Sequence, residues 1–118
     1  MAGKIGRPVK LLALAALLIA GCGRDPAALG AHSSKLFESA EAPIKSEWQT
    51  AMAAVNTNGY VTAVVALQKL QQMKLTPQQL DAVNQTVTAV SDQMYQAANK
   101  GDARAKQALE ELRTLRSR

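Results

Sequence analysis

The chain has 118 residues, a formal net charge of +5 and a single cysteine. Its length suits one small domain, and one cysteine excludes internal disulfides and thiolate metal clusters. Three of the 14 basic residues precede residue 11, so the chain from residue 22 onward has 11 basic and 9 acidic residues, a net charge of +2. This balance argues against a nucleic acid as a partner.

The first twenty residues have the pattern of a secretory signal. Lys4, Arg7 and Lys10 precede residues 11–20, which read LLALAALLIA and contain no polar side chain. A membrane-spanning helix needs roughly 20 apolar residues, whereas a secretory signal has an apolar run of about 7–15 residues behind a basic start. We therefore expect this run to direct export, and an uncleaved membrane anchor is the alternative.

The residues at the end of this run are Ile19, Ala20, Gly21 and Cys22. An aliphatic residue, two small residues and a cysteine in this order resemble the lipobox of bacterial lipoproteins, and the resemblance covers residues 1–23. It implies that the Cys22 thiol receives diacylglycerol and that the chain is cut between Gly21 and Cys22. It also implies that the new amine receives a further acyl chain, such as palmitate, in many Gram-negative bacteria.

The resemblance to lipoproteins also implies a location. Residues 1–21 would be removed as a signal peptide, and acyl chains on Cys22 would hold the remaining 97 residues to a bacterial membrane, facing the periplasm. Gly23, rather than aspartate, follows the cysteine. By similarity to lipoprotein sorting in enteric bacteria, this favours the outer membrane.

Residues 22–34 are predicted to form a flexible tether. After the cysteine they read GRDPAALGAHSS, with Pro26, two glycines and no sustained apolar periodicity. His32, the only histidine, lies in this segment. Because a general base must be held in a fixed geometry, we expect His32 to be exposed and not catalytic. A helical domain is predicted for residues 35–118, with a helical turn or two in residues 35–42.

Two helices are expected on either side of an Asn58-Gly59 stop. Glycine readily takes the left-handed conformation that ends helices, so we expect Gly59 to end the first helix. The first helix, at about residues 43–57, has apolar side chains at helical spacing at Ile44, Trp48, Met52 (or Ala51) and Val55. The second helix, at about residues 60–74, contains Val61, Val64, Val65, Leu67 and Leu70.

The stretch LTPQQL, residues 75–80, predicts the start of a third helix. Thr76 can cap this helix, Pro77 suits its first position, and Gln79 completes a capping box. Leu75 and Leu80 occupy the two positions of a hydrophobic staple. Because the turn is short, the second and third helices are expected to pack antiparallel. The apolar stripe of the third helix comprises Leu80, Val83, Val87, Val90, Met94 and Ala97.

The third helix is expected to end near Lys100, before Gly101, and a fourth helix is expected to follow. Asp102 suits the N-cap position of that helix. Its apolar side comprises Ala105, Leu109, Leu112 and Leu115.

These patterns predict an all-α fold, because no segment shows the period-two alternation of a half-buried strand. The architecture is expected to be a small three- to four-helix antiparallel bundle or a helical-hairpin domain. Residues 59–70 and 101–112 both fit G-x-x-x-A-x-x-A-L-x-x-L, a spacing that suggests helix-pair repeats. Residues 48–70 also resemble a tetratricopeptide repeat, in which small residues let paired helices approach. We favour the plain bundle over a true repeat.

No motif in the sequence indicates an enzyme, a metal site or a cofactor. Phosphate-binding loops, nucleophile elbows and metal-ligand spacings are absent from it. Glu38 and Glu41 stand one helical turn apart, a pattern more typical of a solvated face than of a cation site. Glu110 and Glu111 are adjacent, so on a helix they point about 100° apart.

Two groups of side chains could serve binding. Trp48 and Tyr60 could line a groove for a partner helix, but in a chain with four aromatic residues we favour a place in the core for both. Arg113, Arg116 and Arg118 could contact anionic lipid or wall polymer. We favour the alternative that they complement the dipole at the end of the last helix.

Together these expectations describe a lipid-anchored envelope protein that acts as a non-catalytic interaction or structural module and has a protein partner. One alternative is a peptidoglycan-associated structural lipoprotein similar to the abundant helical one of enteric bacteria. That family attaches to the wall through a terminal lysine, whereas Arg118 is the last residue here. The other alternative is a carrier of a lipid or small ligand, which requires an enclosed cavity.

Overall fold

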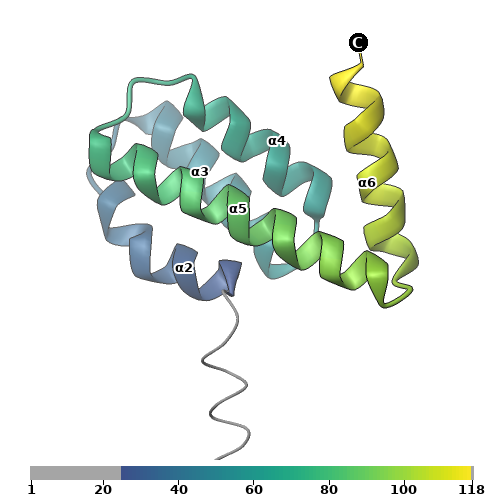
Figure 1. Ribbon diagram of the computed structural model, residues 1–118. Coiled ribbons are helices and arrows are strands. Elements are labelled where there is room, and N and C mark those ends of the chain that lie inside the picture. The colour runs from purple at the N-terminus through teal and green to yellow at the C-terminus, as the bar shows by residue number, and fades with distance from the viewer. Residues whose placement is uncertain (1–24, 118) are drawn as a thin grey trace, which may run out of the picture.

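The computed structural model of the protein describes residues 25–117, and every regular element in that range is a helix. This confirms the all-α prediction. In Figure 1, α2 to α5 form the body of the domain and α6 stands across the C-terminal end of α5. The elements are α2 (Pro26–Ser33), the 3-10 helix η1 (Ser34–Phe37), α3 (Ala42–Asn56), α4 (Tyr60–Gln71), α5 (Pro77–Asn99) and α6 (Ala103–Arg116).

The prediction of a flexible tether is wrong for residues 26–34, because α2 occupies most of them. The Asp25 side chain caps this helix by accepting a hydrogen bond from the Ala27 N–H at 3.1 Å. Pro26 occupies its first turn, where a missing N–H costs nothing. The buried residues of this helix are Pro26 and Gly30, so it has no stripe of large apolar side chains. For this reason the apolar periodicity of the sequence does not predict the helix.

The turn between α3 and α4 is stabilised by a left-handed residue, but that residue is Asn58 and not Gly59. Asn58 has φ = 56°, whereas Gly59 has φ = −81°. The Gly59 N–H donates to the Ala54 carbonyl at 2.8 Å and the Asn58 N–H donates to the Val55 carbonyl at 3.3 Å, which is a Schellman motif. Asparagine tolerates this conformation better than most residues, so it ends α3.

The start of α5 is built as the LTPQQL stretch predicts. The Gln79 N–H donates to Thr76 Oγ1 at 3.1 Å, and the Thr76 N–H donates to Gln79 Oε1 at 2.9 Å. The loop before it is longer than expected, since α4 ends at Gln71. Gln71 at the end of α4 donates from Nε2 to Asn84 Oδ1 in the first half of α5 at 2.8 Å, whereas Val64 near the start of α4 and Met94 in the second half of α5 line the same cleft. The two helices therefore pack in opposite directions, and the predicted antiparallel pairing is confirmed (Figure 1).

The buried face of α5 is wider than the predicted stripe. Leu80 is 39% exposed and Val87 is half-buried, whereas Thr86 and Ala89 are fully buried. The reason is that α5 packs against α4 on one side and α2 on the other, so two flanks of the helix are covered. The buried Thr86 hydroxyl has a hydrogen-bond partner within the same helix, because it donates to the Ala82 carbonyl at 2.8 Å.

Trp48 forms the aromatic centre of the core together with Phe37 of η1. Their rings stack with centroids 4.1 Å apart and an interplanar angle of 9°, and their residues are 3% and 1% exposed. Gln79 of α5 also binds η1, because its Nε2 donates to the Leu36 carbonyl at 2.8 Å. The cap of α5 therefore also anchors the segment that precedes α3.

The last turn and helix follow the sequence prediction. Gly101 has φ = 97°, and the Asp102 side chain accepts hydrogen bonds from the Arg104 and Ala105 N–H groups at 2.9 and 3.3 Å. Both segments of the 12-residue pattern form helices, with Ala63 and Ala105 equally buried at the matching position. Their surroundings differ, because α4 packs against α3, α5 and α6, whereas among the described elements α6 packs mainly on α5 and to a smaller extent on α4.

Candidate interaction surface

The structure assigns the predicted functional residues to three different environments. The lipobox, the predicted cleavage site after Gly21 and Cys22 itself lie outside residues 25–117. Trp48 and Tyr60 are buried, with 3% and 8% of their surfaces exposed. The possibility that these two rings form a partner surface is therefore wrong, and the alternative of core residues, which we favoured, is confirmed. Hydrophobic burial in a chain with few bulky side chains accounts for their position.

Polar residues singled out in the sequence do not converge on one site. His32 is exposed on α2, and Glu38 and Glu41 are exposed in the segment between η1 and α3. The adjacent carboxylates of α6 diverge as expected: Glu110 Oε1 lies 3.1 Å from Arg113 Nη1, whereas Glu111 lines a cleft beside α4. Within the range 25–117, histidine, cysteine, aspartate and glutamate form no group of three that could hold a metal ion.

Among the described residues, Trp48 has the one buried side-chain nitrogen or oxygen atom that lacks a hydrogen-bond partner. Its indole Nε1 is out of contact with solvent and donates to no acceptor there. A cleft of about 150 Å³ lies beside the ring, between η1 and the first turns of α3. Because Nε1 itself is inaccessible, this cleft does not supply the missing acceptor.

The junction of α4, α5 and α6 forms two clefts on the sides of α6. One cleft, of about 220 Å³, lies between the start of α4 and the first half of α6, and it is lined by Tyr60, Arg104, Gln107 and Glu111 among others. The second cleft, which we call the α6 groove, has a volume of about 80 Å³. The α6 groove is lined by Val64, Ser91, Met94, Tyr95, Leu109, Leu112, Arg113 and Arg116.

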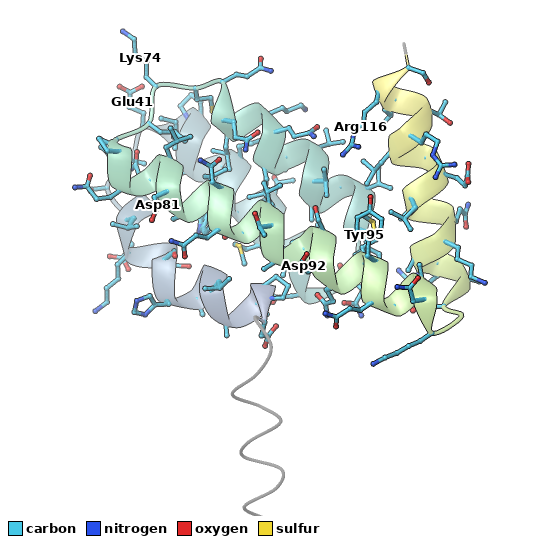
Figure 2. All side chains as sticks on the ribbon, in the orientation of Figure 1. Glu41, Lys74, Asp81, Asp92, Tyr95 and Arg116 are labelled. Carbon is cyan, nitrogen blue, oxygen red and sulfur yellow. The ribbon has the colours of Figure 1, made fainter. Side chains whose placement is uncertain are left out.

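The α6 groove combines an apolar floor with a cationic rim. Met94 and Leu112 are buried at 3% and 7% exposure, while Tyr95 is 53% exposed. Figure 2 shows Tyr95 of α5 and Arg116 of α6 projecting into the space between α6 and the rest of the domain. Among residues 25–117, two arginines and no carboxylate line the groove, so its rim favours a negatively charged group.

Sequence reasoning missed this groove for two reasons. Tyr95 follows Met94, the last large residue of the apolar stripe, and nothing in its position marks it as exposed. The sequence near Arg113 and Arg116 indicates only that they complement the helix dipole, which they do, since both lie in the last turn of α6. Their meeting with Tyr95 depends on how α6 crosses α5, which no local pattern encodes.

Comparison with known proteins does not assign the chain to a family: no family model, curated protein or solved structure matches it. A search of the helices in residues 25–117 also finds none that is long and apolar enough to span a membrane.

Proposed function

We propose that the chain is a lipid-anchored protein of the bacterial cell envelope whose helical domain binds a protein partner and catalyses no reaction. The observation that carries this proposal is the order of residues at the N-terminus. A basic start, the apolar residues 11–20 and the lipobox Ile19-Ala20-Gly21-Cys22 occur together and in sequence. Acyl chains on Cys22 would then anchor the domain to the membrane.

The position of α2 determines how close the domain would lie to an anchor at Cys22. Pro26 lies four positions after Cys22 in the sequence, so the start of α2 would lie within about 14 Å of the lipidated cysteine even if the chain between them were fully extended. The domain would sit directly on the membrane surface that holds the acyl chains. A localisation in the outer membrane, with the domain facing the periplasm, agrees with Gly23 after the cysteine.

A binding role agrees better with the clefts of the domain than a carrier role does. The clefts described above have volumes of about 80, 150 and 220 Å³, whereas sites for small molecules usually enclose roughly 300–1,000 Å³. Shallow clefts between helices suit the side chains of a protein partner. We therefore place the carrier alternative behind the interaction module.

Metabolic labelling tests the anchor. Cells that express the full chain are fed a labelled palmitate analogue, and the protein is recovered and assayed for label. The wild type should carry the label, and Cys22→Ala should lose it and accumulate as the longer precursor. Gly23→Ala serves as a control that keeps the cysteine and should stay labelled. A wild-type protein that is expressed normally and carries no label would contradict the proposal.

A further inference from the structure

We propose that the α6 groove is the docking site for an amphipathic helix that carries acidic residues and belongs to a partner protein. This names the surface and the partner chemistry of the interaction module, and it rests on that proposed function. The groove lies along the second half of α6, where Leu109, Leu112, Arg113 and Arg116 follow one another at helical spacing.

The floor of the α6 groove is formed by apolar side chains that a partner can contact. Val64 and Met94 form part of the core and reach the groove from α4 and α5. Tyr95, which also lines the groove, is 53% exposed. Aromatic and arginine side chains around an apolar centre are the residues that contribute most to binding energy in protein interfaces.

The rim of the groove specifies a negative charge. Arg113 and Arg116 lie one helical turn apart, about 5 Å along the axis of α6. Each guanidinium can hold a carboxylate through two hydrogen bonds. Arg113 also has an exposed ion pair with Glu110 of the same helix, which is worth little in water and leaves other donors of the guanidinium for a ligand. A partner helix with carboxylates one turn apart would match both arginines.

Three other occupants fit the groove less well. A volume of about 80 Å³ holds the tip of one or two side chains and is far below the size of a small-molecule site. A two-fold contact between copies of this chain would place the same arginines near one another. The surface of an anchoring membrane would meet the start of α2, and in Figure 1 the C-terminal end of α6 lies on the other side of the domain from that start.

A titration with designed peptides tests the proposal. The protein is residues 25–118, the range that supplies the core side chains of the described structure, and a dispersed spectrum of the free protein verifies that this range folds on its own. The probes are three 16-residue helices of leucine and alanine that carry glutamate, glutamine or lysine beside the apolar face. Binding is followed by amide chemical shifts in two-dimensional NMR spectra. The glutamate peptide should shift the amides of the groove residues on α4, α5 and α6, and its affinity should fall as salt is added.

Matched variants separate the groove from the general charge of α6. Arg113→Gln with Arg116→Gln should weaken binding of the glutamate peptide by at least about tenfold. Arg104→Gln with Lys106→Gln removes the same charge from the same helix outside the groove and should change the affinity by less than twofold. Arg113→Glu with Arg116→Glu should reverse the preference, so that the lysine peptide binds best. Dispersed spectra of the free variants verify that each one is folded.

Several results would overturn the proposal. These are equal binding of the glutamate and lysine peptides, shifts confined to another face, and unchanged affinity of the Arg113 and Arg116 variants. Shifts of the groove amides by vesicles of phosphatidylglycerol and phosphatidylcholine would point to a membrane occupant, and dimerisation through the groove would point to a second copy. None of these results depends on Cys22, so the lipid anchor and the groove can fail separately.

Discussion

Helices α2 and α5 lie against each other in the domain, but different interactions fix their positions. α5 has 23 residues, a capping box and a face of buried side chains that runs from Gln79 to Ala98. α2 has 8 residues and buries only Pro26 and Gly30. Its contact with α3 is close, because a Cβ on Gly30 would run into the thioether of Met52.

This contrast shows that a helix can be positioned by close backbone packing at a glycine as well as by burial of large side chains. The free energy of α5 comes from apolar area removed from water, and each large side chain contributes to it. α2 buries little apolar area, so its position depends on the absence of a side chain at Gly30 and on the chain that follows it into η1. We therefore expect a buried charge to destabilise the fold most when it is placed in α5, and a larger side chain to disturb the packing of α2 when it replaces Gly30.

The largest effect is expected for a charge at the centre of α5. Val83 is fully buried, so Val83→Asp places a carboxylate among apolar side chains and should cost more than about 4 kcal/mol, enough to unfold the domain. Val87 lies one turn further and is half-buried. Val87→Asp can turn its carboxylate toward water and should cost clearly less. Urea denaturation followed by circular dichroism measures both, and equal losses would mean that the buried face of α5 is misassigned.

The next effect is expected at the junction between α2 and the core. Phe37→Ala removes the ring that stacks on Trp48 and should cost about 3–5 kcal/mol. Leu36→Ala is the matched control, since Leu36 is 39% exposed and should change stability by about 0.5 kcal/mol or less. Trp48 is the only tryptophan, so its emission reports the change, with a shift to longer wavelength in Phe37→Ala. Similar losses in both variants would contradict the stacked arrangement.

A smaller effect is expected for bulk in α2. Gly30→Leu should displace the Met52 side chain and cost about 1–3 kcal/mol through overpacking. Ala31→Leu adds the same side chain at an exposed neighbour and should be nearly neutral. Hydrogen exchange should show faster exchange of the α2 amides in Gly30→Leu, while the amides in the middle of α5 keep their protection. If the α2 amides exchange at the same rate in Gly30→Leu and Ala31→Leu, close packing at Gly30 does not determine the position of this helix.

The smallest effect is expected at the cap of α5. Thr76→Ala removes the hydroxyl that accepts from the Gln79 N–H and should cost about 1 kcal/mol. Thr88→Ala is the control, because the exposed Thr88 hydroxyl only donates to the Asn84 carbonyl in its own helix. Chemical denaturation of the two variants measures the difference, and an equally stable Thr76→Ala would show that the capping box contributes little.

Local signals in the sequence were sufficient for α3 to α6. Capping residues such as Thr76 and Asp102 act through hydrogen bonds within three residues, so the sequence near them determines them. α2 was not predicted because its packing residues are small, and small residues leave no periodic trace. Gly59 was expected to be the left-handed residue, but the neighbouring Asn58 adopts that conformation, and both residues are compatible with the same turn.

The candidate site was less predictable than the fold. Burial of Trp48 and Tyr60 follows from the general need for a core. The α6 groove, in contrast, requires Tyr95 of α5 and Arg116 of α6 to meet, and these residues are 21 positions apart on helices that cross. The crossing is set by how Ala105, Ala108 and Leu112 pack against the body of the domain, which is a tertiary property.

The most direct test of a lipid-anchored domain is the mass of its N-terminal peptide. The full-length protein is purified from the membrane fraction of cells and digested with trypsin, which cuts after Arg24. The account predicts a peptide that begins at Cys22, reads Cys-Gly-Arg and carries the added mass of diacylglycerol, with or without an amide-linked acyl chain. A peptide of residues 11–24 that retains the apolar run and a free thiol on Cys22 would contradict it.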